Sequence, residues 1–112
     1  MKKIEAIVRP AKFEVVKEAL GRFGIHGMTV SQVMGAGLQR GRTGVYRGHK
    51  YDINLLPKVK LELVIRDNLV DEVMQLIADT ARTGEVGDGK IFVYDVQNAV
   101  RVRTGESGDE AI

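Results

Sequence analysis

Alternating apolar and polar residues predict four β-strands. In the first strand, Ile4, Ala6 and Val8 point to one side, and the intervening, mostly charged residues point to the other. β-branched residues support the second strand, which Gly35 and Gly37 are expected to close. The predicted strands span residues 3–9, 28–33, 58–66 and 90–96.

Two further segments carry apolar residues at helical spacing. In residues 12–23 the apolar side chains gather on one side of a helix, and glycines follow where the helix should end. The same spacing returns in residues 69–81, after Asp67 and Asn68, which are candidates for the helix cap. The pattern therefore predicts two amphipathic helices, each directly after a strand.

Strand and helix recur together at a constant offset. Aligning Arg9 with Arg66 places Glu5 on Glu62 and also superimposes the apolar positions of the two helices. Such a repeat indicates two βαβ units. We therefore predict an α+β ferredoxin-like fold, in which both helices lie on one face of a four-stranded antiparallel sheet.

The other face of this sheet would lack a cover. It mixes charged and apolar side chains that could pair across a subunit boundary, which predicts a homo-oligomer, although an ordinary solvated face fits the pattern about equally well. The residues concerned are Lys3, Glu5, Ile7, Arg9, Lys60, Glu62, Val64 and Arg66.

Length and composition limit the class of protein. The 112 residues form one domain, residues 1–112, which excludes a two-domain enzyme, and 44% hydrophobic residues exclude a disordered chain. There is no Cys and there are two His, so thiolate sites are excluded and any metal must rely mainly on oxygen ligands. The first residues are charged and no apolar run approaches about 20 residues, so the cytoplasm is the expected location.

A long connection, residues 37–55, joins the second and third strands. It holds four basic residues against a single Asp, and its Tyr46 and Tyr51 are suited to insertion into a partner or to modification. Unstructured connections of this length are uncommon in compact domains and are usually functional, so we favour a partner-binding loop over a basic loop without a role.

Residues 82–90 resemble a phosphate-binding loop in spacing. Gly84 and Lys90 fit the G-x-x-x-x-G-K pattern, but Ile91 stands where that motif needs Ser or Thr. The loop also leads from helix to strand, the reverse of a P-loop. Gly87 and Gly89 can still form an anion-binding nest, with Lys90 as a point charge.

Arg101 and Arg103 occupy positions i and i+2, so both would project to the same side of an extended strand. Together with the glycine-rich loop they would form a cradle for polyphosphate. The alternatives remain open that the glycines simply build a turn and that the arginines pair with surface carboxylates. Residues 102–112 form a C-terminal loop with an acidic end.

Catalysis has little support in the sequence. The carboxylates are scattered, and His26 and His49 do not complete a Ser-His-Asp arrangement. An ATP-hydrolysing enzyme is disfavoured because no base is placed. A ferredoxin-like RNA-binding module is the alternative reading, but Phe92 and Tyr94 lack a matching aromatic on the first strand, so no nucleic-acid partner is expected.

The whole chain resembles the PII nitrogen-regulatory signal-transduction proteins. The resemblance runs from MKKIEAIVRP through GMTVS, YRG, LPKVK and TGEVGDGKIFV to VRVRTGE. It implies a homotrimer that binds ATP or ADP in clefts between subunits and senses 2-oxoglutarate together with Mg²⁺ and ATP. It also implies that the long loop controls partner proteins, while the protein itself is not an enzyme.

The resemblance further implies a set of nucleotide-binding residues. Thr29 and the backbone near Val64 would contact the base, and Gly35 and Gly37 would shape the floor of the cleft. Leu38 stands where the family often has an Arg that reaches the phosphates. The residues expected to hold the phosphates are Gly87, Asp88, Gly89, Lys90, Arg101 and Arg103.

For 2-oxoglutarate, the resemblance implies that the Gln39 amide oxygen ligates Mg²⁺ and that Lys58 pairs with a carboxylate of the ligand. Gly41 and Gly87 are expected to belong to the same site. A dianion that bridges a metal ion and an ammonium group needs both of these partners.

The loop residues Tyr46, Arg47 and Tyr51 are implied to contact partners, and Tyr51 is a candidate for uridylylation. The favoured partner is an ammonium transporter, which would recruit the protein to the membrane. A uridylyltransferase, an adenylyltransferase and the control of glutamine synthetase are further expectations. His49 replaces a Ser that is phosphorylated in some relatives, which excludes that modification at this position.

Overall fold

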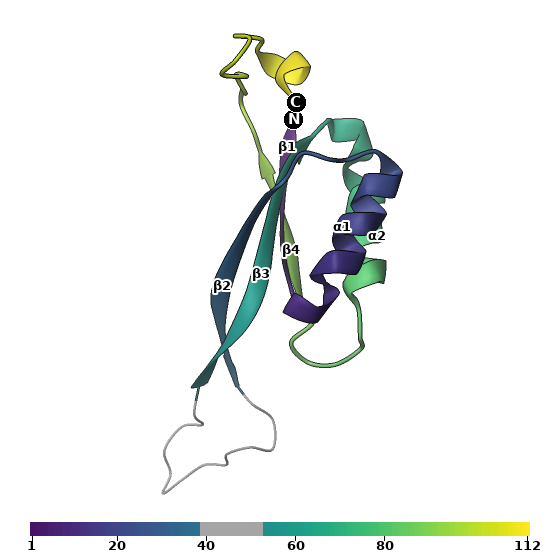
Figure 1. The fold of residues 1–112 in the computed structure, drawn as a ribbon, viewed down its shortest axis with the longest axis vertical. Coiled ribbons are helices and arrows are strands. Elements are labelled where there is room, and N and C mark those ends of the chain that lie inside the picture. Colours follow the sequence, from purple (N-terminus) through teal and green to yellow (C-terminus); the bar gives the residue numbers. More distant parts are fainter. Residues whose placement is uncertain (39–52) are drawn as a thin grey trace, which may run out of the picture.

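The computed structural model describes residues 1–38 and 53–112. Its strands form one antiparallel sheet in the order β2-β3-β1-β4, and both helices pack on the same side of that sheet (Figure 1). This arrangement confirms the predicted ferredoxin-like double βαβ fold. The elements are β1 (Lys2–Val8), α1 (Phe13–Phe23), β2 (Thr29–Leu38), β3 (Ile53–Ile65), α2 (Val70–Ala81) and β4 (Gly89–Asp95), with short 3-10 turns at Pro10–Lys12, Asp67–Leu69 and Gly108–Ala111.

The core lies between the helices and the sheet. Alternate residues of β1 and β3 are buried against the apolar faces of α1 and α2, as the period-2 and helical patterns predict. Nearly complete burial of these large side chains is the main stabilising contribution to the fold. Its largest members are Ile4, Leu20, Leu61, Ile77, Val8, Val16 and Val73.

The predicted repeat is visible in the register of the sheet. β1 and β3 pair antiparallel so that Glu5 lies directly opposite Glu62, its counterpart in the second unit. The counterpart pair Leu20 and Ile77 is buried on the two helices, at 0% and 1% exposure. The two βαβ units are therefore related by an approximate two-fold axis that passes between Glu5 and Glu62.

The hairpin of β2 and β3 is longer than the sequence pattern predicts. β2 continues through Gly35 and Gly37 to Leu38, and β3 begins at Ile53 rather than at residue 58. The prediction that the glycines close β2 is wrong because the paired partner strand satisfies their backbone groups and carries the ladder onward. The part of the connection outside the described residues is 39–52.

The C-terminal prediction of an extended VRVR strand is also wrong. Residues 102–104 form a turn, in which the Gly105 N–H donates to the Arg101 carbonyl and the Arg101 N–H to the Glu106 carbonyl, both at 2.8 Å. Gly105 adopts φ +76°, a left-handed conformation that favours glycine and reverses the chain. Arg101 and Arg103 therefore do not follow each other on a strand.

Among the described residues, no helix is long and apolar enough to cross a membrane.

Candidate functional site

The face of the sheet that points away from α1 and α2, called the open face below, carries charge in a polarised arrangement. In the register of the sheet, Lys60, Ile7 and Lys90 lie side by side across β3, β1 and β4. Two residues towards the other end of β1, Glu62 and Glu5 are neighbours in the same way. One end of the open face is therefore basic, and its middle is acidic.

Lysine side chains partly neutralise the acidic middle. The Lys3 ammonium lies 3.3 Å from a Glu62 carboxylate oxygen and 4.6 Å from the centre of the Tyr94 ring. The Lys60 ammonium lies 3.7 Å from Glu62, and the Tyr94 hydroxyl donates to Glu5 at 3.3 Å. The side chains of Lys3, Glu5 and Glu62 are each about a third exposed or less.

The loop between α2 and β4 is closed by one carboxylate. Asp88 accepts bonds from the backbone N–H groups of Thr83 and Gly84, both at 2.8 Å, and from the Thr83 hydroxyl. The Arg9 Nε also donates to Asp88, at 3.0 Å. The hydrogen bonds from Thr83, followed by those from Arg9 and Gly84, hold the pKa of Asp88 well below its usual range.

Cationic side chains also fix the backbone of this loop. The Arg9 guanidinium donates to the Val86 carbonyl at 2.8 Å, and the Lys58 ammonium donates to the Gly87 carbonyl at 2.5 Å. Gly35 leaves room for Lys58, because a Cβ at position 35 would lie 3.2 Å from the Lys58 Cγ. Lys58 is therefore in contact with both Gly35, which the resemblance assigns to the nucleotide cleft, and Gly87, which it assigns with Lys58 to 2-oxoglutarate.

Gly89 is required where the loop enters β4. Its φ is +113°, and a Cβ there would lie 1.7 Å from the Ile7 carbonyl oxygen of the neighbouring strand. No side chain fits at such a distance, so the close approach of β4 to β1 depends on this glycine. The next residue, Lys90, is exposed and shares the open face with Ile7.

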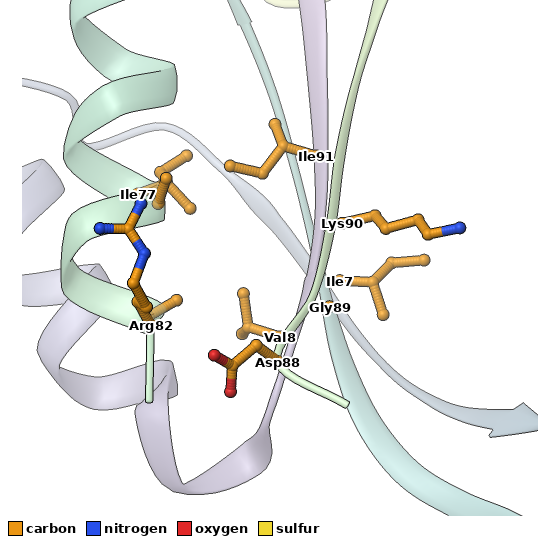
Figure 2. A pocket seen from close by; sticks show the side chains of 10 residues that line it. Ile7, Val8, Ile77, Arg82, Asp88, Gly89, Lys90 and Ile91 are labelled. Atoms are coloured by element: carbon orange, nitrogen blue, oxygen red, sulfur yellow. The ribbon is translucent and has the colours of Figure 1, made fainter. Parts of the chain in front are cut away.

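A groove of about 280 Å³ lies on the opposite side of the sheet, between the C-terminal end of α2 and the start of β4. Figure 2 shows Ile77 of α2, and Arg82 directly after its end, facing Val8, Asp88 and Ile91 across it, whereas the Lys90 side chain points away on the other side of the sheet. The groove and the basic end of the open face are therefore two separate surfaces on either side of β1 and β4.

Arg9 was missed as a member of the site. Its sequence position suggests only a charged residue at the end of a strand, yet it bonds both Asp88 and Val86. The signal that could have identified it is topological. In a double βαβ fold β1 lies next to β4, so the residue that follows β1 meets the loop that precedes β4.

The predicted nucleotide-binding residues divide into two groups. Gly87, Asp88, Gly89 and Lys90 lie at one end of β4, and the C-terminal segment with Arg101 and Arg103 lies beyond its other end (Figure 1). The two groups lie at opposite ends of the seven-residue strand β4, a span of about 20 Å. Within one chain these groups do not form a single cradle, so a cradle that contains both would need a second subunit.

Thr29 and Val64 lie at the end of the sheet that is next to the C-terminal segment with Arg101 and Arg103. Thr29 begins β2, and Val64 is the second-last residue of β3. Gly37 and Leu38 lie at the far end of β2, towards residues 39–52. One subunit thus presents two incomplete sets of the predicted residues, at opposite ends of its sheet.

Several predicted residues lie outside the described part of the chain. These are Gln39, Gly41, Tyr46, Arg47 and Tyr51. Within residues 1–38 and 53–112 there is no group of three His, Cys, Asp or Glu side chains that could hold a metal ion. The basic end of the open face is suited to anions, so it does not by itself provide a metal site.

Known proteins match this chain along its length. The family model described as "Nitrogen regulatory protein P-II" matches residues 1–106. "Nitrogen regulatory protein P-II" of Haemophilus influenzae and "Nitrogen regulatory protein P-II 1" of Escherichia coli K12 are both 54% identical to it over 112 residues, 100% of either chain. A solved structure, "Structure of B. subtilis GlnK", aligns with a TM-score of 0.84 and 43% identity, and covers 99% of this chain and 97% of that one.

Proposed function

The chain belongs to the nitrogen regulatory protein P-II family, and on that basis we propose that it senses adenine nucleotides and 2-oxoglutarate and controls partner proteins. As a member of this family it is a signal-transducing regulator. The RNA-binding alternative is not favoured, because the aromatic residues of β4 adjoin the acidic pair Glu5 and Glu62 on the open face.

The division of the predicted nucleotide site into two groups is the observation that carries the proposal. Gly87 and Lys90 lie at the start of β4, and Arg101 and Arg103 lie beyond its other end, about 20 Å away. A second copy of the chain can bring the two groups together. We therefore propose a homotrimer in which each ATP or ADP binds between neighbouring subunits.

At the basic end, four cations favour a polyphosphate. Lys60 and Lys90 flank Ile7 across the sheet, and Arg9 and Lys58 both donate to the loop that precedes β4, where Asp88 pairs with Arg9. Because ATP carries several negative charges, such a site attracts it strongly, and charge-assisted hydrogen bonds then fix the phosphates. Leu38 supplies no charge, so phosphate binding rests on the remaining basic residues.

Lys58 is the residue that we assign to 2-oxoglutarate. Its ammonium is held 2.5 Å from the Gly87 carbonyl at the edge of the phosphate loop, where it can exchange that neutral acceptor for a carboxylate. The metal ion would be held by the Gln39 amide oxygen and by nucleotide phosphates, because Mg²⁺ prefers oxygen ligands. Mg²⁺ would supply the second positive partner that the dianion needs.

Ligand binding would act on partner proteins through the long connection between β2 and β3. A ligand held by Lys58 lies close to the strands from which this connection starts, so it can change which conformations the connection adopts. Tyr46, Arg47 and Tyr51 would then contact an ammonium transporter at the membrane, or a uridylyltransferase or adenylyltransferase that controls glutamine synthetase.

Calorimetric titration with ATP, and then with 2-oxoglutarate in the presence and absence of Mg²⁺ and ATP, tests the proposal. We expect ATP to bind, and 2-oxoglutarate to bind only with Mg²⁺ and ATP. Lys90→Ala should weaken ATP binding about tenfold or more, because it removes a charged hydrogen-bond donor. Lys58→Ala should keep ATP binding and lose the response to 2-oxoglutarate.

Mixed oligomers test the division between subunits. Subunits with Lys90→Ala and subunits with Arg101→Ala should each bind ATP poorly alone. In randomly mixed trimers about a quarter of the clefts should combine two intact groups and recover wild-type affinity. A monomer by sedimentation, or mixtures that bind no better than either variant, would contradict the assignment of the cleft.

A further inference from the structure

A seven-residue segment occurs twice in this chain with one difference, Val86 in the first copy and Ser107 in the second. Residues 82–88 read RTGEVGD and residues 103–109 read RTGESGD. The first copy is the loop before β4, and the second lies in the C-terminal segment, at the other end of that strand. The two copies are therefore the parts of the chain that the proposed nucleotide site would draw from neighbouring subunits.

The two copies share several local features of their backbone. Gly84 and Gly105 have φ of +90° and +76°, and Gly87 and Gly108 have φ of +101° and +69°. In each copy the N–H of the Glu donates to the Thr hydroxyl two residues earlier, at 3.1 Å and 3.3 Å. The repeated sequence thus carries the same glycine conformations and the same threonine turn, although the second copy continues into a 3-10 turn that the first lacks.

In both copies one carboxylate oxygen joins the Thr hydroxyl to an arginine from outside the segment. Asp88 Oδ1 accepts from the Thr83 hydroxyl and from Arg9 Nε. Glu106 Oε1 accepts from the Thr104 hydroxyl at 2.8 Å and from Arg101 Nη1 at 3.1 Å. The carboxylate comes from a different position of the segment in the two copies, yet the arrangement of threonine, carboxylate and arginine is the same.

We propose that Glu106 is a positioning residue that holds the Arg101 guanidinium ready for a nucleotide phosphate, as Asp88 holds Arg9 at the other end. This inference rests on the proposed nucleotide site. A guanidinium has five N–H donors, and the bond to Glu106 uses one of them, which leaves the rest for phosphate oxygens. Ordering a long side chain in advance lowers the entropy cost of binding.

An alternative role for Glu106 would be to compete with phosphate. Its negative charge lies beside the same arginine, and removing it would then strengthen nucleotide binding. The side chains of Arg101 and Glu106 are both 41% exposed, so solvent and salt screen that repulsion. At physiological salt the gain in ATP affinity from ordering Arg101 should therefore exceed the loss from repulsion between Glu106 and the phosphates.

ATP titrations of the intact protein and three variants at physiological salt distinguish these roles. Glu106→Ala should weaken ATP binding about three- to tenfold, because Arg101 loses its fixed orientation. Glu106→Gln keeps an acceptor oxygen and should bind within about twofold of wild type. The control Glu110→Ala removes a carboxylate from the same C-terminal segment and should bind like wild type.

A double-mutant cycle with Arg101→Ala shows whether Glu106 acts through the arginine. In the Arg101→Ala background, Glu106→Ala should cause no further loss. Thermal unfolding and sedimentation of each variant check that fold and assembly are unchanged.

Three results would overturn the inference. These are stronger ATP binding in Glu106→Ala, unchanged ATP binding in Glu106→Ala, and a loss of the same size whether or not Arg101 is present. If the wild-type protein itself bound no ATP, the proposed function would fail, and that outcome is distinct from a wild type that binds and a Glu106→Ala variant that binds equally well.

Discussion

The two faces of the sheet contribute differently to this protein. The face under α1 and α2 presents apolar residues, and Ile4, Ala6 and Leu61 on it are completely buried. The open face presents Lys60, Ile7 and Lys90 in one row and Glu62 beside Glu5 in another. Since neighbouring residues of one strand serve both faces, stability and ligand binding are encoded at alternating positions of the same segments.

The largest effect should follow a change on the helix-covered face. Leu61→Ala removes a side chain that is fully buried in the core and leaves a cavity, so the free energy of unfolding should fall by about 2–5 kcal/mol. The neighbouring Lys60→Ala lies on the open face and removes a partly exposed ion pair with Glu62, which should cost at most about 1 kcal/mol. Denaturant unfolding of both variants measures the difference.

Equal destabilisation by the two variants would show that both faces support the fold to the same extent. The assignment of stability to the helix-covered face alone would then be wrong.

An intermediate effect should follow a change in the loop between α2 and β4, which leads from the helical layer into the sheet. Asp88 has a lower pKa in the folded protein than its usual 3.8, so its bonds stabilise the fold above about pH 4. That stabilisation is lost as the pH falls below about 4 and through the lower pKa that Asp88 has in the folded protein. Asp88→Asn should therefore be less stable than wild type at pH 7, and its unfolding temperature should fall less steeply under acid conditions.

The matched control for this prediction is Asp109→Asn. Asp109 holds the equivalent position in the second copy, where Glu106 rather than Asp109 accepts the bonds from threonine and arginine. Unfolding temperatures measured from pH 7 to pH 2 should show the wild-type profile for Asp109→Asn. Identical profiles for wild type and Asp88→Asn would contradict the role assigned to Asp88.

The smallest effect should follow the loss of a charge from the helical layer. Lys17 pairs with Glu14 on α1 at 2.9 Å, and both side chains are about half exposed or more. Lys17→Ala should lower the free energy of unfolding by about 0.2–0.5 kcal/mol. ATP affinity should not change, whereas Lys90→Ala should reduce it.

If Lys17→Ala weakened ATP binding as much as Lys90→Ala, binding would depend on overall charge. The open face would then have no special role.

Local patterns were sufficient for most of the fold. The alternation in β1 identified the buried face, helical spacing identified α1 and α2, and the repeat predicted the double βαβ arrangement. The ends of the β2–β3 hairpin were less predictable. Glycines normally weaken strands, but here the partner strand satisfies their backbone groups.

The site was predictable in its parts and not in its assembly. The sequence singles out Gly87, Lys90 and Arg101, because glycine-rich and basic segments suit anions, whereas Lys58 is indicated only by the family resemblance. It does not reveal that Arg9 bonds Asp88, 79 positions away, or that Arg101 lies in a turn against Glu106. Periodicity depends on residues close in the chain and can be recognised in the sequence. The Arg9–Asp88 pair depends instead on strand order and register, which only the folded sheet sets. The Arg101–Glu106 pair depends on a turn in which Gly105 adopts a left-handed conformation, which the alternation of the sequence does not indicate.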